Sequence, residues 1–419
     1  MPHSSRFPAG MSILGAMLLA IGPGWAIDYE HEPIRYSHTP ANNVITRLQA
    51  DLDAGKTNLA WTEEHGYLPA LLRQLHVPLS SQVLVFSATS QQRHLIGPKS
   101  PRAIYFNDEV HIGFVRGGFL ELAVADPELG MVFYQLAQDR TATPKFVRLT
   151  DNCLSCHGST RTRDVPGLLV RSVFVGPDAQ PILAAGNYRT DQSSPLEQRW
   201  GGWYVSGTHG NQRHLGNLVL PSSRKPKTID NAAGQNVTDL SRFFDVKSYL
   251  TPHSDIVALM VLEHQIDAHN YLTRLRFTAR LARHRLNESD AKARVAEAVD
   301  DLVKQLLFSR ETALTAPIQG TSEFARDFAA AGRRDRHGRS LRDFDLQRRI
   351  FRYPCSYMVY STAFDTLPAE VKEDVYRRLW QVLSGEDQRE DFQHLCPEDR
   401  QAIVQILRDT KADLPAYWR

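Results

Sequence analysis

Two cysteines and a histidine lie together in RLTDNCLSCHGSTRT, residues 148–162. Cys153 and Cys156 are separated by two residues, His157 follows directly, and the chain of 419 residues contains only four cysteines. In a c-type haem attachment site, the two thiols of such a CxxCH motif form thioethers with the haem vinyl groups, and the histidine becomes the proximal iron ligand. The motif therefore predicts one covalent haem c at Cys153 and Cys156, with His157 as its axial ligand.

Three other roles are possible for this CxxC pair. A thioredoxin-like redox pair begins a helix after a strand; PKFVRLTDN could supply the strand, but Gly158 and the Arg-rich stretch behind it do not predict a helix with an apolar face. A zinc site would need two more ligands at short spacing, whereas Cys355 and Cys396 are remote. A disulfide within CxxC would close a strained loop. Cys355 and Cys396 could themselves form a disulfide or remain separate thiols, and both alternatives stay open.

The first 26 residues have the features of a secretory signal peptide. Arg6 gives a positively charged start, MSILGAMLLAIGPG is a short apolar run, and Gly24 and Ala26 are small residues before the expected cleavage point. Removal of these 26 residues from 419 leaves 393. Because a membrane span needs about 20 apolar residues, an uncleaved anchor is the lesser alternative. We expect an exported, soluble periplasmic protein with no membrane span after signal cleavage, to which haem is added after export.

The composition is that of a folded globular protein. Hydrophobic residues make up 42% of the chain and charged residues 23%, and the formal net charge is +2. This small charge gives no indication of a nucleic-acid partner. The length predicts one or two domains.

Two patterns of secondary structure divide the chain. Residues 60–76 predict a short helix, and runs rich in β-branched and aromatic residues then predict an antiparallel meander: VLVF, AIYF, EVHIGFV, FLELAVA and MVFYQLA. After the motif, GLLVRSVFV and PILAAG predict a hairpin and WGGWYVSG one more strand. A polar stretch at residues 221–238 is a candidate linker. Beyond it, four stretches have the periodicity of helices: residues 254–286, 288–309, 368–385 and 397–414. We predict an α+β fold: signal peptide 1–26, antiparallel β-rich haem domain 27–225 and α-helical domain 226–419.

The sixth ligand of the iron decides between electron transfer and ligand binding. His209 and His214 lie in the glycine-rich stretch SGTHGNQRHLGN, where the backbone could approach a flat cofactor closely, so we expect one of them to be the distal ligand. An open or water-bound site is the next alternative, and Met260 or His264 on the first long helix is the third. Partners for the haem propionates, or surface ion pairs, could come from the nearby Arg189, Arg199, Trp200, Trp203 and Arg213.

The chain as a whole resembles a group of exported bacterial cytochrome c domain-containing proteins. The residues that carry the resemblance are the CxxCH motif with RAIYFNDEV, VPGLLVRSVF, EQRWGGWYVSGTHG and FRYPCSYMVYSTAFDTLP. The resemblance implies covalent haem at Cys153 and Cys156 with His157 as ligand, and no transferable activity. The order of strands, motif and LLVR strand is also similar, over a short stretch, to haem-c PAS-like sensor domains. Because about 150 residues precede the motif, the all-helical fold of small soluble cytochromes c cannot be carried over.

Three functions compete. The first is a periplasmic mono-haem cytochrome that transfers electrons to a redox partner protein, and one attachment site suffices for it. The second is a haem-dependent, peroxidase-like oxidoreductase, although exported di-haem peroxidases need two CxxCH motifs. The third is a haem-based redox or gas sensor module, for which no output domain is evident. Residues 333–349 hold seven arginines against three aspartates, and this run could dock an acidic partner or simply be a solvated face. Electron transfer is the leading expectation.

Overall fold

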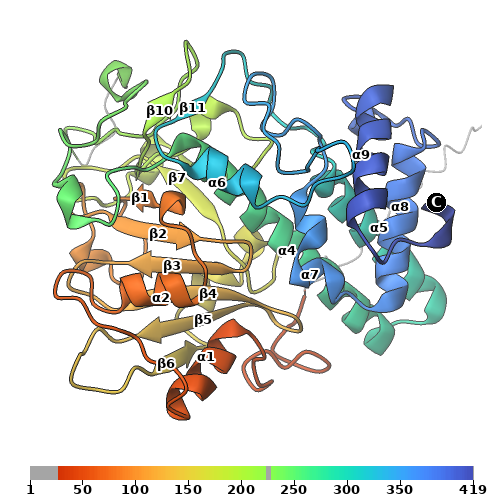
Figure 1. Cartoon of the computed structure of the whole chain (residues 1–419), viewed down its shortest axis with the longest axis horizontal. Coiled ribbons are helices and arrows are strands. Elements are labelled where there is room, and N and C mark those ends of the chain that lie inside the picture. The colour runs from red at the N-terminus through yellow and green to blue at the C-terminus, as the bar shows by residue number, and fades with distance from the viewer. Residues whose placement is uncertain (1–26, 223–227, 419) are drawn as a thin grey trace, which may run out of the picture.

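A seven-stranded antiparallel sheet organises the N-terminal half of the chain (Figure 1). The structure is a computed structural model that describes residues 27–222 and 228–418, so the expected signal peptide and the domain boundary expected at residue 225 lie outside the described residues. In spatial order the strands are β6 (Phe146–Leu149), β5 (Gly130–Leu136), β4 (Leu120–Asp126), β3 (Val110–Phe114), β2 (Arg102–Phe106), β1 (Val83–Val85) and β9 (Trp203–Tyr204). The expected meander is confirmed, because β1 to β6 pair in chain order.

The two faces of the sheet are covered by different helices. On one face, the Tyr134 hydroxyl of β5 meets Asn43, the N-cap of α1 (Val44–Asp53), and α2 (Leu68–Gln74) lies beside it. On the other face, His111 of β3 is bonded to Gln265 of α4 (Ile256–Arg285). His111 lies in the cross-strand row of Ala123 and Phe133, so it faces away from Tyr134. The sheet is therefore enclosed between α1 and α2 on one side and α4 on the other.

Helix α4 connects the sheet to the helical half. It begins at the N-cap Asp255, whose side chain accepts from Val257 and Ala258, and most of its 30 residues are buried. It packs on α5 (Glu288–Leu306), and α5 contacts α8 (Ala369–Leu383). Helix α8 in turn contacts α9 (Pro397–Thr410). The short helices α6 (Phe324–Ala330) and α7 (Thr362–Asp365) also contact α4. The expected α+β class, with helices in the C-terminal half, is confirmed.

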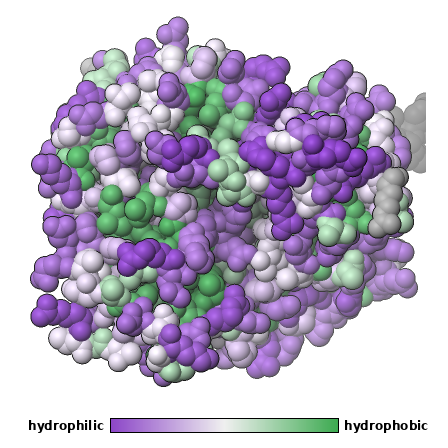
Figure 2. Space-filling view, in the orientation of Figure 1, coloured by the Kyte–Doolittle hydropathy of each residue, from purple (hydrophilic) through white to green (hydrophobic). Residues whose placement is uncertain are grey.

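The two halves share backbone pairing and one hydrophobic core. Strand β10 (Gly207–Thr208) pairs with β11 (Gln319–Gly320), a contact between segments more than 100 residues apart. A single cluster of buried apolar side chains runs from Ile27 to Trp418. In Figure 2, hydrophobic residues gather over the strand-rich left part of this face, whereas the helical right part is mostly hydrophilic. Within the two described ranges, no helix combines the length and hydrophobicity that a membrane span requires.

Some local expectations differ from the structure. The expected hairpin of GLLVRSVFV and PILAAG is present in part, because Val175 and Pro181 form an isolated antiparallel bridge and the Ile182 amide donates to the Phe174 carbonyl at 2.7 Å. The regular strand β7 (Val170–Val173) pairs instead with β8 (Asn187–Thr190), and Leu183–Ala185 is a 3-10 turn. The helix expected over residues 60–76 is limited to α2, because Thr62 and Gly66 form an isolated bridge before it. Helix α1 was not expected, although Asn43 and Thr46 form a capping box there.

Candidate functional site

The CxxCH residues occupy a single helical turn. Helix α3 (Leu154–His157) has Cys153 at its N-cap, and the His157 and Gly158 amides donate to the Cys153 and Leu154 carbonyls at 2.8 and 2.9 Å. Because one turn brings residues i and i+3 to the same side, both cysteines can face one partner. Cys153 is half-buried and Cys156 is exposed. The Tyr29 hydroxyl donates to the Gly158 carbonyl at 3.3 Å and holds the end of the turn.

His157 is oriented by the backbone of Gly167. Its Nδ1 lies 2.9 Å from the Gly167 carbonyl oxygen, so Nδ1 carries the proton, and the Gly167 amide donates to the His157 carbonyl at 2.8 Å. The ring packs on Phe133 of β5 at a centroid distance of 5.1 Å. Burial lowers the pKa of His157, although the Gly167 carbonyl opposes this shift. The result is a neutral imidazole whose Nε2 lone pair is free of any hydrogen bond from the described residues.

Asn270 of α4 fixes the segment that holds His157. Its Oδ1 accepts from the Leu168 amide at 3.0 Å and its Nδ2 donates to the Leu168 carbonyl at 2.7 Å. A Cβ on Gly167 would lie 2.1 Å from Asn270 Oδ1, so only glycine fits at position 167. Asn270 therefore positions the carbonyl that orients His157.

A buried carboxylate of α4 holds the turn that follows the motif. Asp267 accepts two bonds from Arg163, at 3.1 and 3.0 Å, and a further bond from Arg189 of β8. The Arg163 guanidinium also lies 3.6 Å above the Tyr271 ring. Arg163 and Asp164 both have positive φ angles, 62° and 60°, which cost free energy for residues other than glycine. The contacts of Arg163 offset that cost and fix the loop against α4.

A glycine and polar side chains line the sheet beside His157. Gly113, Glu121 and Gln135 are opposite one another on β3, β4 and β5, and Glu121 pairs with Arg102 of β2 at 2.7 Å. Beyond the larger effects of burial and of the Gly167 carbonyl, the charge of Arg102 lowers the pKa of His157 and the charge of Glu121 raises it. A Cβ on Gly113 would lie 3.3 Å from the Glu121 carboxylate, so the side-chain-free position lets the ion pair lie close to the sheet.

The thiol and zinc alternatives fit these residues poorly. Burial raises the pKa of Cys153 to about 11, the opposite of the lowered pKa that a redox-active CxxC thiol needs. The α3 turn is also too short to be the helix of such a pair.

All four cysteines are free, with Cys355 buried and Cys396 exposed at the N-cap of α9, so the two distant cysteines do not form a disulfide in this structure. In the described parts of the chain, no three His, Cys, Asp or Glu side chains gather where a metal ion could bind.

The residues present do fit covalent haem. Both thiols are free on one turn, and the hydrogen bond from His157 Nδ1 leaves Nε2 as the unprotonated nitrogen that an iron ligand must supply. Cys153 and Cys156 would hold the haem and His157 would ligate the iron, which supplies one-electron chemistry.

The structure does not bring His209 or His214 into contact with the motif. The two rings pack on each other at 4.7 Å and are almost fully buried. His209 Nε2 accepts from the Asn236 amide, and His214 Nδ1 from the Gly216 amide, both at 3.0 Å. Burial, and then His209, lowers the pKa of His214 to about 3. No hydrogen bond or ring contact among the described residues joins them to residues 153–157, and a distal role for either stays a prediction.

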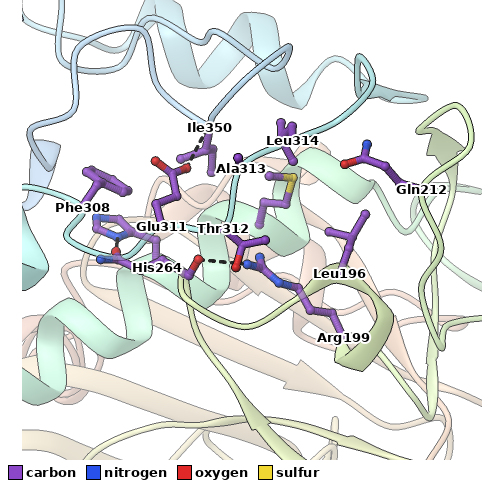
Figure 3. Close-up of a pocket in the computed structure, with 12 residues that line it drawn as sticks. Leu196, Arg199, Gln212, His264, Phe308, Glu311, Thr312, Ala313, Leu314 and Ile350 are labelled. Atoms are coloured by element: carbon purple, nitrogen blue, oxygen red, sulfur yellow. Dashed lines mark hydrogen bonds between the residues drawn. The ribbon is translucent and has the colours of Figure 1, made fainter. Parts of the chain in front are cut away.

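Met260 and His264, the next candidates for the distal ligand, line a separate small cavity (Figure 3). His264 uses both ring nitrogens, Nδ1 with Gln192 at 2.9 Å and Nε2 with Ser356 at 2.6 Å. The cavity measures about 20 Å³, enough for a single water. Glu311 and Ile350 lie on one side of it and Arg199 on the other. Burial raises the pKa of Glu311 to about 7.

Most of the arginines noted in the sequence are already paired with carboxylates. Arg199 bonds to the buried Glu263 at 2.9 Å, and Arg189 to Asp191 and Asp267. In the run 333–349, six of the seven arginines form ion pairs within the described structure, namely Arg334–Asp343, Arg336–Asp409, Arg339–Asp335, Arg342–Asp108, Arg348–Asp345 and Arg349–Asp399. Three of these pairs tie the run to Asp409, Asp108 and Asp399 elsewhere in the chain, and a docking role for the run stays a prediction.

Comparisons of the chain with protein-family models, with curated proteins and with solved structures found no match.

Proposed function

We propose that this protein is a periplasmic mono-haem c-type cytochrome that transfers electrons through a haem attached to Cys153 and Cys156. The observation that carries the proposal is the state of His157: a carbonyl fixes its proton on Nδ1 and leaves Nε2 for iron. Proximal histidines of metal sites are held in this way because the bond sets both the tautomer and the orientation of the ring. Export by the first 26 residues would deliver the chain to the compartment where such haem is attached.

Electron transfer is favoured over catalysis because the described structure offers no substrate-sized enclosed site beside the motif. The cavity at His264 and Glu311 holds about one water, and its lining side chains bond to one another. An electron carrier needs only a cofactor that lies near the surface, and Cys156 is exposed.

The test is to express the full chain in a host with c-type haem assembly and to record its visible spectrum, oxidised and reduced, with and without carbon monoxide. We expect haem that stays on the protein after denaturation, and a low-spin reduced spectrum that carbon monoxide does not change. Cys153→Ala and Cys156→Ala should each leave a single thioether, and the double variant should hold no covalent haem. Cys396→Ala, an exposed cysteine elsewhere, is the matched control and should load normally.

Wild-type protein without covalent haem would refute the proposal. A high-spin spectrum that shifts with carbon monoxide would keep the haem but replace electron transfer by an enzyme or sensor function.

A further inference from the structure

Arg102 of β2 has two guanidinium nitrogens without a partner. Its Nη1 donates to Glu121 of β4 at 2.7 Å, whereas its Nε is buried without an acceptor and its Nη2 makes no hydrogen bond with any described residue. The side chain is only 20% exposed, so water does not surround this guanidinium as it would on an open surface. Buried donors without an acceptor are rare in folded proteins, and each one calls for an explanation.

The unpartnered nitrogens form the edge with which other arginines of this protein bind a carboxylate. Arg163 uses Nε and Nη2 for the two oxygens of Asp267, and Arg336 uses the same two nitrogens for Asp409. Two parallel N–H groups match the two oxygens of one carboxylate, and such bidentate bonds are strong and directional. The open edge of Arg102 is therefore shaped for a carboxylate that the described chain does not supply.

Two other arginines in the described ranges have a buried Nε without a partner, but neither has an open edge. Arg148 donates through Nη1 and Nη2 to two backbone carbonyls. Arg349 donates through the same two nitrogens to Asp399, and through Nη2 also to the Arg352 carbonyl. Of the three arginines, Arg102 alone keeps both Nε and Nη2 for an external group.

The pair of Arg102 and Glu121 lies on the face of the sheet that the ring of His157 contacts. That ring packs on Phe133 of β5 at 5.1 Å, and Gln135, two residues further along β5, is directly opposite Glu121. Residues two apart on a strand point to the same face. Glu121 is therefore a diagonal cross-strand neighbour of Phe133, at about 7–8 Å.

We propose that the Nε and Nη2 edge of Arg102 binds a propionate of the haem. This inference rests on the proposed function and deepens it, because it names a residue of the haem site. Haem has two propionate carboxylates, and its attachment to Cys153 and Cys156, with His157 as iron ligand, would bring them within reach of groups beside His157.

Glu121 holds the guanidinium in position for this role. Gln92 donates to the Glu121 carboxylate at 3.0 Å, so Glu121 is fixed from a second direction while it accepts from Arg102. One arginine shared by two carboxylates already occurs in this protein, since Arg189 bonds to both Asp191 and Asp267. A propionate on the free edge of Arg102 would repeat that arrangement.

The test is resonance Raman spectroscopy of the full chain loaded with haem, because the bending vibrations of the propionates report the hydrogen bonds that they accept. The variants are Arg102→Leu, which removes the guanidinium, and Arg102→Lys, which keeps the charge but has no planar fork. The matched control is Arg349→Leu. Arg349 is similarly buried, has an unpartnered Nε and pairs with Asp399 of α9, which lies in the helical half of the molecule (Figure 1).

We expect a propionate band of the wild type to shift in both Arg102 variants and to stay in place in the Arg349 control. Loss of a positive charge beside the haem favours the ferric state, so Arg102→Leu should also shift the redox equilibrium about tenfold, or about 59 mV, toward the oxidised form. Arg102→Lys and the charge-neutral double variant Arg102→Leu/Glu121→Gln should recover most of this potential but not the band. An arginine with only a structural role would not separate the two measurements in this way.

The same spectra distinguish the possible failures. Wild-type protein without covalent haem would overturn the proposed function and this inference with it. Normal haem with identical propionate bands in the wild type and both Arg102 variants would overturn only the role of Arg102, and so would an equal shift in Arg349→Leu. If Arg102→Leu holds no haem, Arg102→Lys decides: a shifted band supports the bidentate bond, and an unchanged band refutes it.

Discussion

At the scale of single residues, the site depends on contacts made to its backbone. The candidate residues Cys153, Cys156 and His157 could be selected from their spacing alone, because the proposed attachment motif is contiguous in the sequence. Asn270 and Gly167 were not evident, since an asparagine on a helix 102 residues away from its partner leaves no pattern in the sequence. The structure was needed to show that they orient His157.

Replacement of Asn270 by leucine should destabilise the protein by about 2–3 kcal/mol. The Leu168 amide and carbonyl would both remain buried without a partner. In the haem-loaded protein the reduction potential should also shift, because the Gly167 carbonyl would no longer be fixed against His157. Chemical denaturation and a redox titration measure the two effects. Asn270→Asp, which keeps one of the two bonds, should lie between leucine and wild type, and an unchanged potential in both variants would contradict the positioning role.

Glu311 should make stability depend on pH. Its pKa in the folded protein is raised to about 7, mainly by burial, while the Ile350 amide, Arg199 and Arg349 oppose the rise and Asp345 adds to it. Between the unfolded pKa of about 4.5 and pH 7 the folded state holds more protons, so stability falls as pH rises through this window. We expect wild type to lose about 3 kcal/mol relative to Glu311→Gln between pH 4.5 and 8. A difference between the two proteins that does not change with pH would contradict the raised pKa.

At the scale of elements, local patterns predicted the meander and the long helices. Strands β2 to β5 are joined by short turns, and α8 and α9 begin with a proline at or next to the first turn and show a clear helical periodicity. The pairings of β9 and β11 escaped prediction because they depend on segments distant in sequence. Strand β8 pairs with the nearby β7, but it was not expected as a strand. Helix α4 showed the right length, but nothing in its sequence indicated that its charged residues are buried.

Those buried charges make α4 sensitive to substitution. Glu263 is 1% exposed and accepts from Arg199 at 2.9 Å and from Thr190 at 2.6 Å. Because Arg199→Met leaves a buried carboxylate without its cation, it should cost about 3–5 kcal/mol. Arg377→Met, whose pair with Glu373 on α8 is exposed, is the control and should cost less than about 1 kcal/mol. Unfolding midpoints in urea measure both, and equal losses would contradict the importance of burial.

At the scale of the whole molecule, the two halves should fold together. The sheet face around His111 is covered only when α4 is present, and β10 needs β11 from the other half. We expect residues 27–418 to unfold in one transition, with coincident circular dichroism and tryptophan fluorescence curves. Residues 27–222 expressed alone should show no cooperative transition. A fragment with a sharp transition of its own would instead support two independently folding domains, divided as the composition of the sequence suggests.

The contacts of Asp267 and Asn270 with residues 163–168 also affect when the motif becomes fixed during synthesis and folding. Asp267 and Asn270, which lock residues 163–168, are made about 100 residues later than those residues. At a synthesis rate of about 5–20 residues per second, the stretch with both thiols exists for about 5–20 s before its lock is available. For an exported chain the interval is longer still, because residues 163–168 stay unlocked until α4 has crossed the membrane and folded onto them, so the haem attachment expected after export can precede the closing of this lock.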